Sequence, residues 1–203
     1  MMMTIKRSRV DDNWFNPAPR LTFNLRIEDV ALAMQDVYDF FFDVNSFLLG
    51  RGLPRLDDTI RPAILSGLIS DMLTESVAKH SRSLTPNRFH NGHPDLLVAG
   101  VYPENKAKAG TMGVEVKSTG KRGGAVDFHG ARDQWVMVFV YEVDTQSEPA
   151  CEREPLRFSE VYLANVTADD FRRNERGELG TRTATLDKDG LVKLRAGWLY
   201  KEP

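Results

Sequence analysis

The sequence predicts an α/β fold of the α+β kind, with a central mixed β-sheet flanked by helices. Three observations predict it. Residues 28–49 and 57–81 show helical periodicity, short strand-like runs separated by turns begin near residue 93, and a β-branched and aromatic run at 135–143 is typical of a buried strand. The chain has 203 residues, enough for one domain with a sizeable core, and it shows no internal repeat.

The N-terminal part is expected to combine an arm with a helix. Residues 1–27 should form an irregular or strand-like arm, because Pro17 and Pro19 interrupt it. From residue 28 onward, apolar residues recur at alternating steps of four and three, which predicts a helix that packs in the core or against a second copy. Its apolar stripe contains Val30, Met34, Val37, Phe41, Val44 and Leu48.

The second helix is expected to start at an aspartate cap and to carry acids on one face. Asp57 or Asp58 can cap its first turn, and Pro62 falls where a helix tolerates proline. Asp71 and Glu75 are one helical turn apart and therefore share a face. This helix leads through a polar loop toward the predicted sheet.

Strands are predicted throughout the second half of the chain. We expect them at 93–101, 113–118, 135–143 and 160–166. Thr167 can cap a short helix that runs through Arg173. The tail from 181 to 200 is predicted to be a β-hairpin that turns at 187–190, because an Asp-Gly pair is a strong turn signal.

Composition excludes some classes of protein. The longest apolar run has seven residues, Trp135 to Tyr141, far short of the roughly 20 that a membrane-spanning helix needs. No apolar stretch follows the basic residues of the N-terminus, so we expect no secretory signal. Cys151 is the only cysteine, which rules out an intrachain disulfide and favours a cytoplasmic location.

The charge is unevenly distributed. The net charge is −2, but from Arg82 to Arg132 there are eight basic residues against four acidic ones. Such a segment could form a basic cleft that captures DNA electrostatically. A solvated charged face is the alternative, and the sequence leaves both open.

The most specific feature is Pro94-Asp95, followed by Glu115-Val116-Lys117 in the next predicted strand. Side chains alternate along a strand, so Glu115 and Lys117 share a face while Val116 points into the core. Two close carboxylates favour a divalent cation between them, and a lysine beside it can position or help to deprotonate a water. This is the equipment of metal-dependent phosphodiester hydrolysis.

With a helix before the aspartate and a buried strand after the lysine, residues 57–145 resemble the PD-(D/E)xK nuclease superfamily, which includes many type II restriction endonucleases. The matching residues are Pro94, Asp95, Glu115 and Lys117. In that superfamily the preceding helix often supplies another acid, which corresponds here to Glu75 or Asp71. The alternative is a surface hairpin with a cross-strand Glu–Lys pair.

The resemblance implies a restriction-endonuclease-like core with one or two Mg²⁺ ions, for which Mn²⁺ can substitute. Asp95, Glu115 and the carbonyl of Val116 would hold the metal, and Glu75 would contribute directly or through water. Lys117 would orient the attacking water or offset charge near the phosphate. Residues near the motif are candidates for DNA contacts, namely His93, Ser118, Thr119, Lys121 and Arg122.

The sequence therefore predicts a single nuclease domain over 1–203. Its parts are an N-terminal arm (1–27), a helical element (28–56), a catalytic core (57–145) and a C-terminal β-rich part (146–203). We expect a Mg²⁺-dependent endonuclease acting on double-stranded DNA, most simply a homodimeric restriction enzyme. The alternatives are a repair or recombination nuclease of the same fold, a non-catalytic nucleic-acid-binding protein that retains it, and a plain structural domain.

Overall fold

The computed structural model describes residues 5–149, 152–173 and 183–203. The helices are α1 (Ile27–Gly50), α2 (Leu56–Thr59), α3 (Pro62–His80) and α4 (Lys188–Ala196), with short 3-10 turns η1 (Asp12–Trp14), η2 (Pro103–Asn105) and η4 (Ala168–Asp170). The strands are β1 (Leu84–Pro86), β2 (Leu96–Val98), β3 (Gly113–Thr119), β4 (Asp127–Phe128), β5 (Gln134–Glu142), β6 (Arg157–Val166), β7 (Phe171–Arg173), β8 (Ala184–Leu186) and β9 (Trp198–Lys201).

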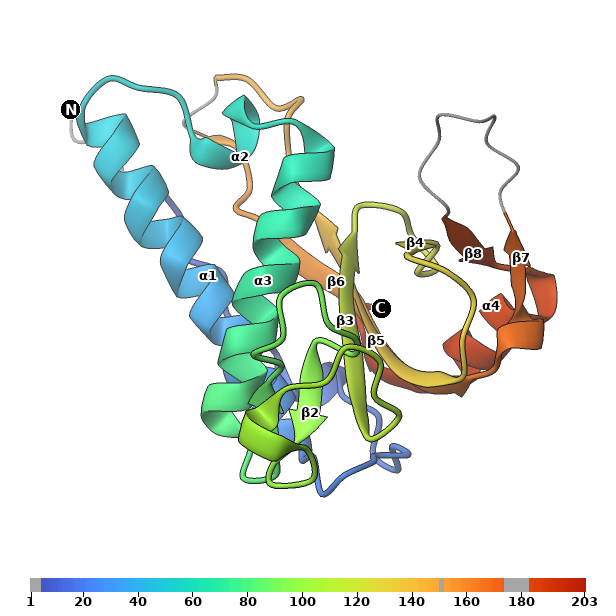
Figure 1. Ribbon diagram of the computed structural model, residues 1–203. Helices are drawn as coiled ribbons and strands as arrows, with labels where there is room; N and C mark the ends of the chain where they lie inside the picture. Colours follow the sequence, from blue (N-terminus) through green and yellow to red (C-terminus); the bar gives the residue numbers. More distant parts are fainter. Residues whose placement is uncertain (1–4, 150–151, 174–182) are drawn as a thin grey trace, which may run out of the picture.

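Six strands form a mixed sheet in the order β1-β2-β3-β5-β6-β9. Strands β3 and β5 are parallel, and the other neighbours are antiparallel. The strands β4-β8-β7 form a separate small antiparallel sheet. Figure 1 shows α1 and α3 on one side of the large sheet and α4 beside the small sheet on the other. The predicted mixed α/β fold with helices flanking a central mixed sheet is confirmed.

Strand β5 is buried on both faces. One face packs against α1 and α3, and the other packs against α4 and the small sheet. The residues on the first face are Met137, Phe139 and Tyr141, and those on the second are Val136, Val138 and Val140. This double burial explains why the strand reads as a continuous apolar run, and the prediction of a central strand at 135–143 is confirmed.

Helix α1 confirms the helix predicted at 28–49, and it lies against α3. A carboxylate joins the two helices. Asp36 Oδ2 contacts Ser76 Oγ, and it lies 2.9 Å from both Lys79 Nζ and His80 Nε2. Partial burial by itself raises the pKa of Asp36, but these three contacts outweigh burial and hold that pKa below its ordinary value of 3.8.

We expect Asp36→Asn to lower the free energy of unfolding by about 1 kcal/mol at neutral pH, a small value because the site is partly exposed. The carboxyl group has a lower pKa in the folded state than in the unfolded state. Its contribution is therefore complete above the unfolded pKa and is lost as pH falls through the folded pKa. Urea unfolding at neutral pH and near ~pH 3 should show the difference shrinking in acid. A difference that does not change with pH would contradict this role of Asp36.

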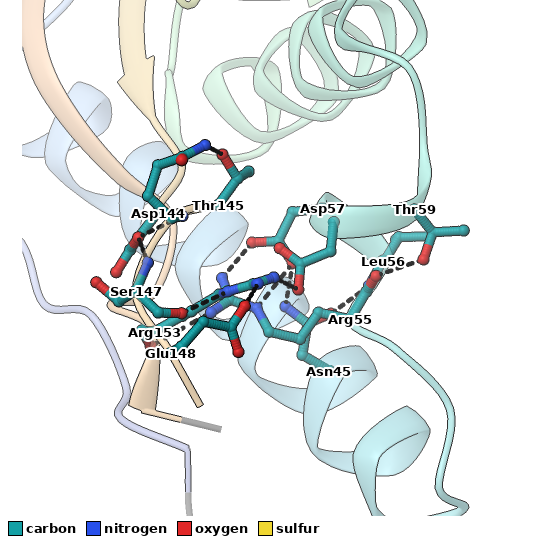
Figure 2. A network of polar contacts seen from close by, with 12 residues as sticks. Asn45, Arg55, Leu56, Asp57, Thr59, Asp144, Thr145, Ser147, Glu148 and Arg153 are labelled. Carbon is teal, nitrogen blue, oxygen red and sulfur yellow. Dashed lines mark hydrogen bonds and ion pairs between the residues drawn. The ribbon is translucent and has the colours of Figure 1, made fainter. Parts of the chain in front are cut away.

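A buried polar network joins the end of α1 to α2 and to the segment before β6 (Figure 2). Asp57 is its centre, because it pairs with the guanidinium of Arg55 and accepts a hydrogen bond of 2.8 Å from Asn45 Nδ2. Arg55 Nη1 also donates to the carbonyls of Arg153 and Glu154 at 3.3 and 3.2 Å. The side chain of Arg55 is 3% exposed and that of Asp57 is fully buried, so each satisfies the other's charge.

The helix predicted at 57–81 is wrong in its first turns. The chain forms α2, becomes extended at Ile60 and Arg61, and begins α3 at Pro62. The residue before a proline is disfavoured in helical conformation, which explains the break at Arg61. Asp57 is consequently a buried member of α2 rather than the cap of a long helix.

Two strand predictions also need correction. The segment predicted as a polar loop at 83–92 contains β1, and only 96–98 of the strand predicted at 93–101 is regular. The strands predicted at 113–118 and 160–166 are confirmed as β3 and β6.

The predicted C-terminal β-hairpin is wrong. Residues 187–190 do not form its turn, because Asp187 caps α4 by accepting a hydrogen bond of 2.8 Å from Gly190 N–H. Helix α4 separates β8 from β9, and these strands belong to different sheets. After Thr167 the chain forms the single turn η4 and then β7, so the short helix predicted there ends early. Residues 1–4 of the predicted arm, Cys151 and residues 181–182 of the predicted hairpin lie outside the described residues.

None of the helices in the described parts of the chain is long and apolar enough to cross a membrane.

Candidate active site

Strands β2 and β3 bring the motif residues together. They pair only through Leu96↔Val114 and Leu97↔Gly113, so Asp95 lies just before the paired region, opposite Glu115. The expected placement of Asp95 and Glu115 on neighbouring strand edges is therefore observed. Beyond Val114, no described strand pairs with β3 on the β2 side. At the motif, this edge of β3 faces the Asp95 side chain rather than a strand.

The two carboxylates and the lysine form one cluster. Lys117 Nζ lies 2.6 Å from Glu115 Oε1 and 3.6 Å from Asp95 Oδ2. Asp95 Oδ2 also accepts a hydrogen bond of 2.8 Å from the Val116 N–H. The N–H and C=O of one strand residue point to the same edge, so the Val116 carbonyl faces the side where Asp95 lies, while its side chain is buried in the core.

The cluster shifts the pKa values of all three groups. Burial raises the pKa of Asp95 above 3.8, although the charge of Lys117 opposes it. Burial also acts to raise the pKa of Glu115, but the hydrogen bond from His93 and the charge of Lys117 prevail and hold that pKa at about 2. Burial would lower the pKa of Lys117, but the two carboxylates prevail and raise it. Lys117 is therefore a cation at neutral pH, and Glu115 is an anion.

The oxygen atoms at this cluster are of the type that Mg²⁺ prefers, but Glu115 is 2% exposed and contacts Lys117 and His93 with its two oxygens. Two carboxylates and a backbone carbonyl are hard oxygen ligands, which Mg²⁺ prefers, and Mg²⁺ usually completes its shell with waters and substrate phosphate. Asp95 keeps 28% of its side chain exposed toward the adjoining cleft, so its oxygens can be reached from solvent. Over the described ranges, no three His, Cys, Asp or Glu side chains converge on one point. Water and substrate would therefore supply the remaining ligands.

A cleft of about 1520 Å³ adjoins the cluster, and both Asp95 and Lys117 line it. One wall is the first half of α3, where Ser66, Gly67 and Ser70 face the cleft. Asp71 belongs to the same wall, whereas Glu75, one turn further on, does not. Of the two helix acids considered from the sequence, the structure brings Asp71 to the cleft.

Ser118 and Thr119 line the cleft but use their hydroxyl groups within the protein. Ser118 Oγ donates to the Ser66 carbonyl at 2.8 Å, which ties β3 to α3. Thr119 Oγ1 donates to the Ala125 carbonyl at 3.2 Å and accepts from the Lys121 N–H at 3.1 Å. Both residues are buried, so their first role is to shape the walls of the cleft.

Of the remaining candidates for DNA contact, Lys121 and His93 line the cleft and Arg122 does not. Lys121 is exposed and lines the cleft. Arg122 is absent from the lining and forms an ion pair with Glu142, with Nε 2.7 Å from Oε1. His93 lines the cleft, but its Nδ1 lies 3.2 Å from Glu115 Oε2, so it also helps to fix that carboxylate.

Of the two possibilities that the sequence leaves open, a basic cleft and a solvated charged face, the structure does not form a basic cleft. Its lining contains two lysines, Lys117 and Lys121, against five carboxylates, namely Asp57, Asp71, Asp95, Asp127 and Glu142. Several arginines instead form ion pairs with carboxylates that are far away in the sequence, as Arg122 does with Glu142. Arg55 already neutralises Asp57, and Arg122 and Arg157 both pair with Glu142, so the lining carries mixed charge rather than a strong net charge of either sign.

Sequence reasoning identified Asp71 of the α3 wall, but not Ser66, Gly67 and Ser70 beside it or the loop residues Asn91 and Gly92, which also line the cleft. Neither carries a recognisable motif, and only the folded chain brings them to the cluster. Comparison with known protein families and with curated proteins finds no match to this chain. The candidate site therefore stands on its own geometry.

Proposed function

We propose that this protein is a metal-dependent endonuclease that hydrolyses phosphodiester bonds of double-stranded DNA, most simply a type II restriction enzyme. The observation that carries the proposal is the cluster of Asp95, Glu115 and Lys117, which joins two strands at a cleft with Lys117 Nζ 2.6 Å from Glu115 Oε1. The resemblance of Pro94-Asp95 and Glu115-Val116-Lys117 to the PD-(D/E)xK motif supports the same reaction.

The two close carboxylates of Asp95 and Glu115 support a need for metal. Mg²⁺, or Mn²⁺ in its place, held by Asp95, Glu115 and the Val116 carbonyl would polarise the scissile phosphate and lower the pKa of a bound water. Asp71 is the candidate for a further acid from the opposite wall. Without a divalent cation, Asp95 and Glu115 would oppose the approach of the scissile phosphate.

Lys117 contributes a fixed positive charge. Because its pKa is raised by the carboxylates around it, Nζ donates hydrogen bonds rather than accepting a proton at neutral pH. Placed beside the phosphate, it can orient the attacking water and offset the negative charge that develops in the transition state. His93 and Lys117 together hold Glu115 ionised and in position.

We propose further that the protein acts as a homodimer in the cytoplasm. A single cluster per chain cuts one strand, and a two-fold pair of chains can cut both. The single cysteine of the chain agrees with a reducing compartment.

The proposal is tested by incubating the purified protein with unmodified plasmid or phage DNA in Mg²⁺ and in EDTA. We expect discrete fragments in Mg²⁺ only. A smear with the same metal dependence would indicate a nuclease that recognises DNA shape. Absence of cleavage on unmodified, methylated and branched duplexes would refute the nuclease proposal and favour a non-catalytic binding protein.

Lys121 and Arg122 are neighbouring cations, and only Lys121 lines the cleft, so alanine variants of the two test the DNA contact against a matched control. We expect Lys121→Ala to weaken DNA binding several-fold and to reduce the slope of log affinity against log salt by about one, as the loss of one phosphate contact does. Arg122→Ala should change both much less, because Glu142 already neutralises the guanidinium. Binding titrations at several salt concentrations measure both effects, and equal losses in the two variants would contradict this assignment.

A further inference from the structure

The loop between β1 and β2 presents exposed side chains beside the candidate site. It leads directly into Asp95, and Asn91, Gly92 and His93 all line the cleft. At its tip, Phe89 is 40% exposed, and His90 and Asn91 are also exposed. Phe89 does not itself line the cleft, but it lies two residues before Asn91, which does.

The loop is firmly braced, and Asn87 is the main support. Its Nδ2 donates to the carbonyls of Pro94 and Ala107 at 3.0 and 2.7 Å, and its Oδ1 accepts from the N–H groups of Phe89 and Ala107 at 3.0 and 3.1 Å. Gly92 adds a close approach, because a Cβ at this position would lie 2.3 Å from the Ala107 carbonyl oxygen. These contacts hold the backbone of the loop on both sides of its tip.

The loop also reaches the opposite wall of the cleft. The rings of His93 and His129 lie 5.9 Å apart between centroids, and His129 belongs to the long connection between β3 and β5. His93 in turn contacts Glu115. A chain of contacts thus links the loop directly to the carboxylate cluster.

We infer that Phe89 and Asn91 contact the nucleotide next to the cleaved phosphate and determine which sequence is cut. This inference rests on the proposed nuclease function. A rigid exposed aromatic ring can stack on a base or insert beside one where the duplex is opened, and base–aromatic stacking contributes strongly to affinity. Asn91 carries the amide that pairs with adenine or other base edges. Asp95 follows Asn91 by only four residues, so both act on the same stretch of DNA.

The experiment compares cleavage by wild type, Phe89→Ala, Phe89→Trp, Asn91→Ala and the control Phe47→Ala. Phe47 is a matched control because it is 64% exposed and lies on α1, away from the loop that lines the cleft. We expect Phe89→Ala to raise the KM for DNA about tenfold, and Phe89→Trp to retain wild-type affinity. Asn91→Ala should broaden the base preference at one position beside the cut, determined by sequencing fragment ends. Phe47→Ala should match wild type in both measurements, and thermal unfolding should show that all variants are folded.

The outcomes separate this inference from the proposed function. If wild type cleaves DNA with Mg²⁺ but Phe89→Ala and Asn91→Ala match it in KM and in cut-site preference, the inference is overturned and the nuclease proposal stands. An equal rise in KM for Phe89→Ala and Phe47→Ala would also overturn it. If wild type neither binds nor cleaves DNA, both proposals fail together.

Discussion

Lys117→Met should reduce Mg²⁺-dependent DNA cleavage by about 10²–10³-fold or more while leaving most DNA affinity intact. The methionine keeps much of the side-chain volume but removes the charge that Glu115 and Asp95 surround. Asp95→Asn should reduce both cleavage and Mg²⁺ affinity, because it removes a negative ligand while an amide oxygen can still accept from the Val116 N–H. Single-turnover cleavage rates and Mg²⁺ titrations measure these effects.

The control for charge alone is Lys106→Ala, since Lys106 is half exposed and pairs with Glu104 outside the cleft. It should cleave DNA at the wild-type rate. Thermal unfolding of Lys117→Met and Asp95→Asn should show folded proteins. Full activity in Lys117→Met would contradict the assigned role of Lys117, and an unchanged Mg²⁺ dependence in Asp95→Asn would contradict that of Asp95.

Asp57→Ala should lower the free energy of unfolding by about 3–5 kcal/mol, because it leaves the guanidinium of Arg55 buried without its counter-charge. Asn45 loses a hydrogen-bond acceptor in the same change. The part of the network in Figure 2 that joins Asn45, Arg55 and Asp57 is then broken, so α2 and the segment before β6 should loosen together. Urea unfolding at neutral pH measures the loss.

The matched control is Glu154→Ala, which removes the exposed ion pair between Lys6 and Glu154. Their side chains are 66% and 55% exposed, so this pair should contribute between about 0 and 1 kcal/mol. Similar losses in Asp57→Ala and Glu154→Ala would contradict the importance of burial at Asp57.

The parts of the fold that the sequence predicts well are those with strong local patterns. Helix α1 has a long apolar stripe, and β3 and β5 combine β-branched residues with clear boundaries. The cluster of Asp95, Glu115 and Lys117 follows from strand alternation together with one strand pairing.

The parts that the sequence does not predict depend on competition between local signals or on distant partners. In the segment 187–190, the turn preference of Asp189-Gly190 competes with the capping preference of Asp187. The cap prevails because α4 can bury Leu194. The charge of the cleft depends on pairs such as Arg122–Glu142, which no local pattern reveals. Asp71 and Glu75 share one face of α3, so which of them reaches the cleft depends on where the cleft lies along the helix axis.

The shared use of β5 by two hydrophobic cores has a consequence for how the protein melts. Neither core can lose its packing without exposing one face of the strand on which the other depends. The small sheet and α4 should therefore unfold in the same cooperative transition as the helical layer, even though they form a distinct lobe in Figure 1. Calorimetry should give a single heat-absorption peak whose measured enthalpy equals its van't Hoff enthalpy.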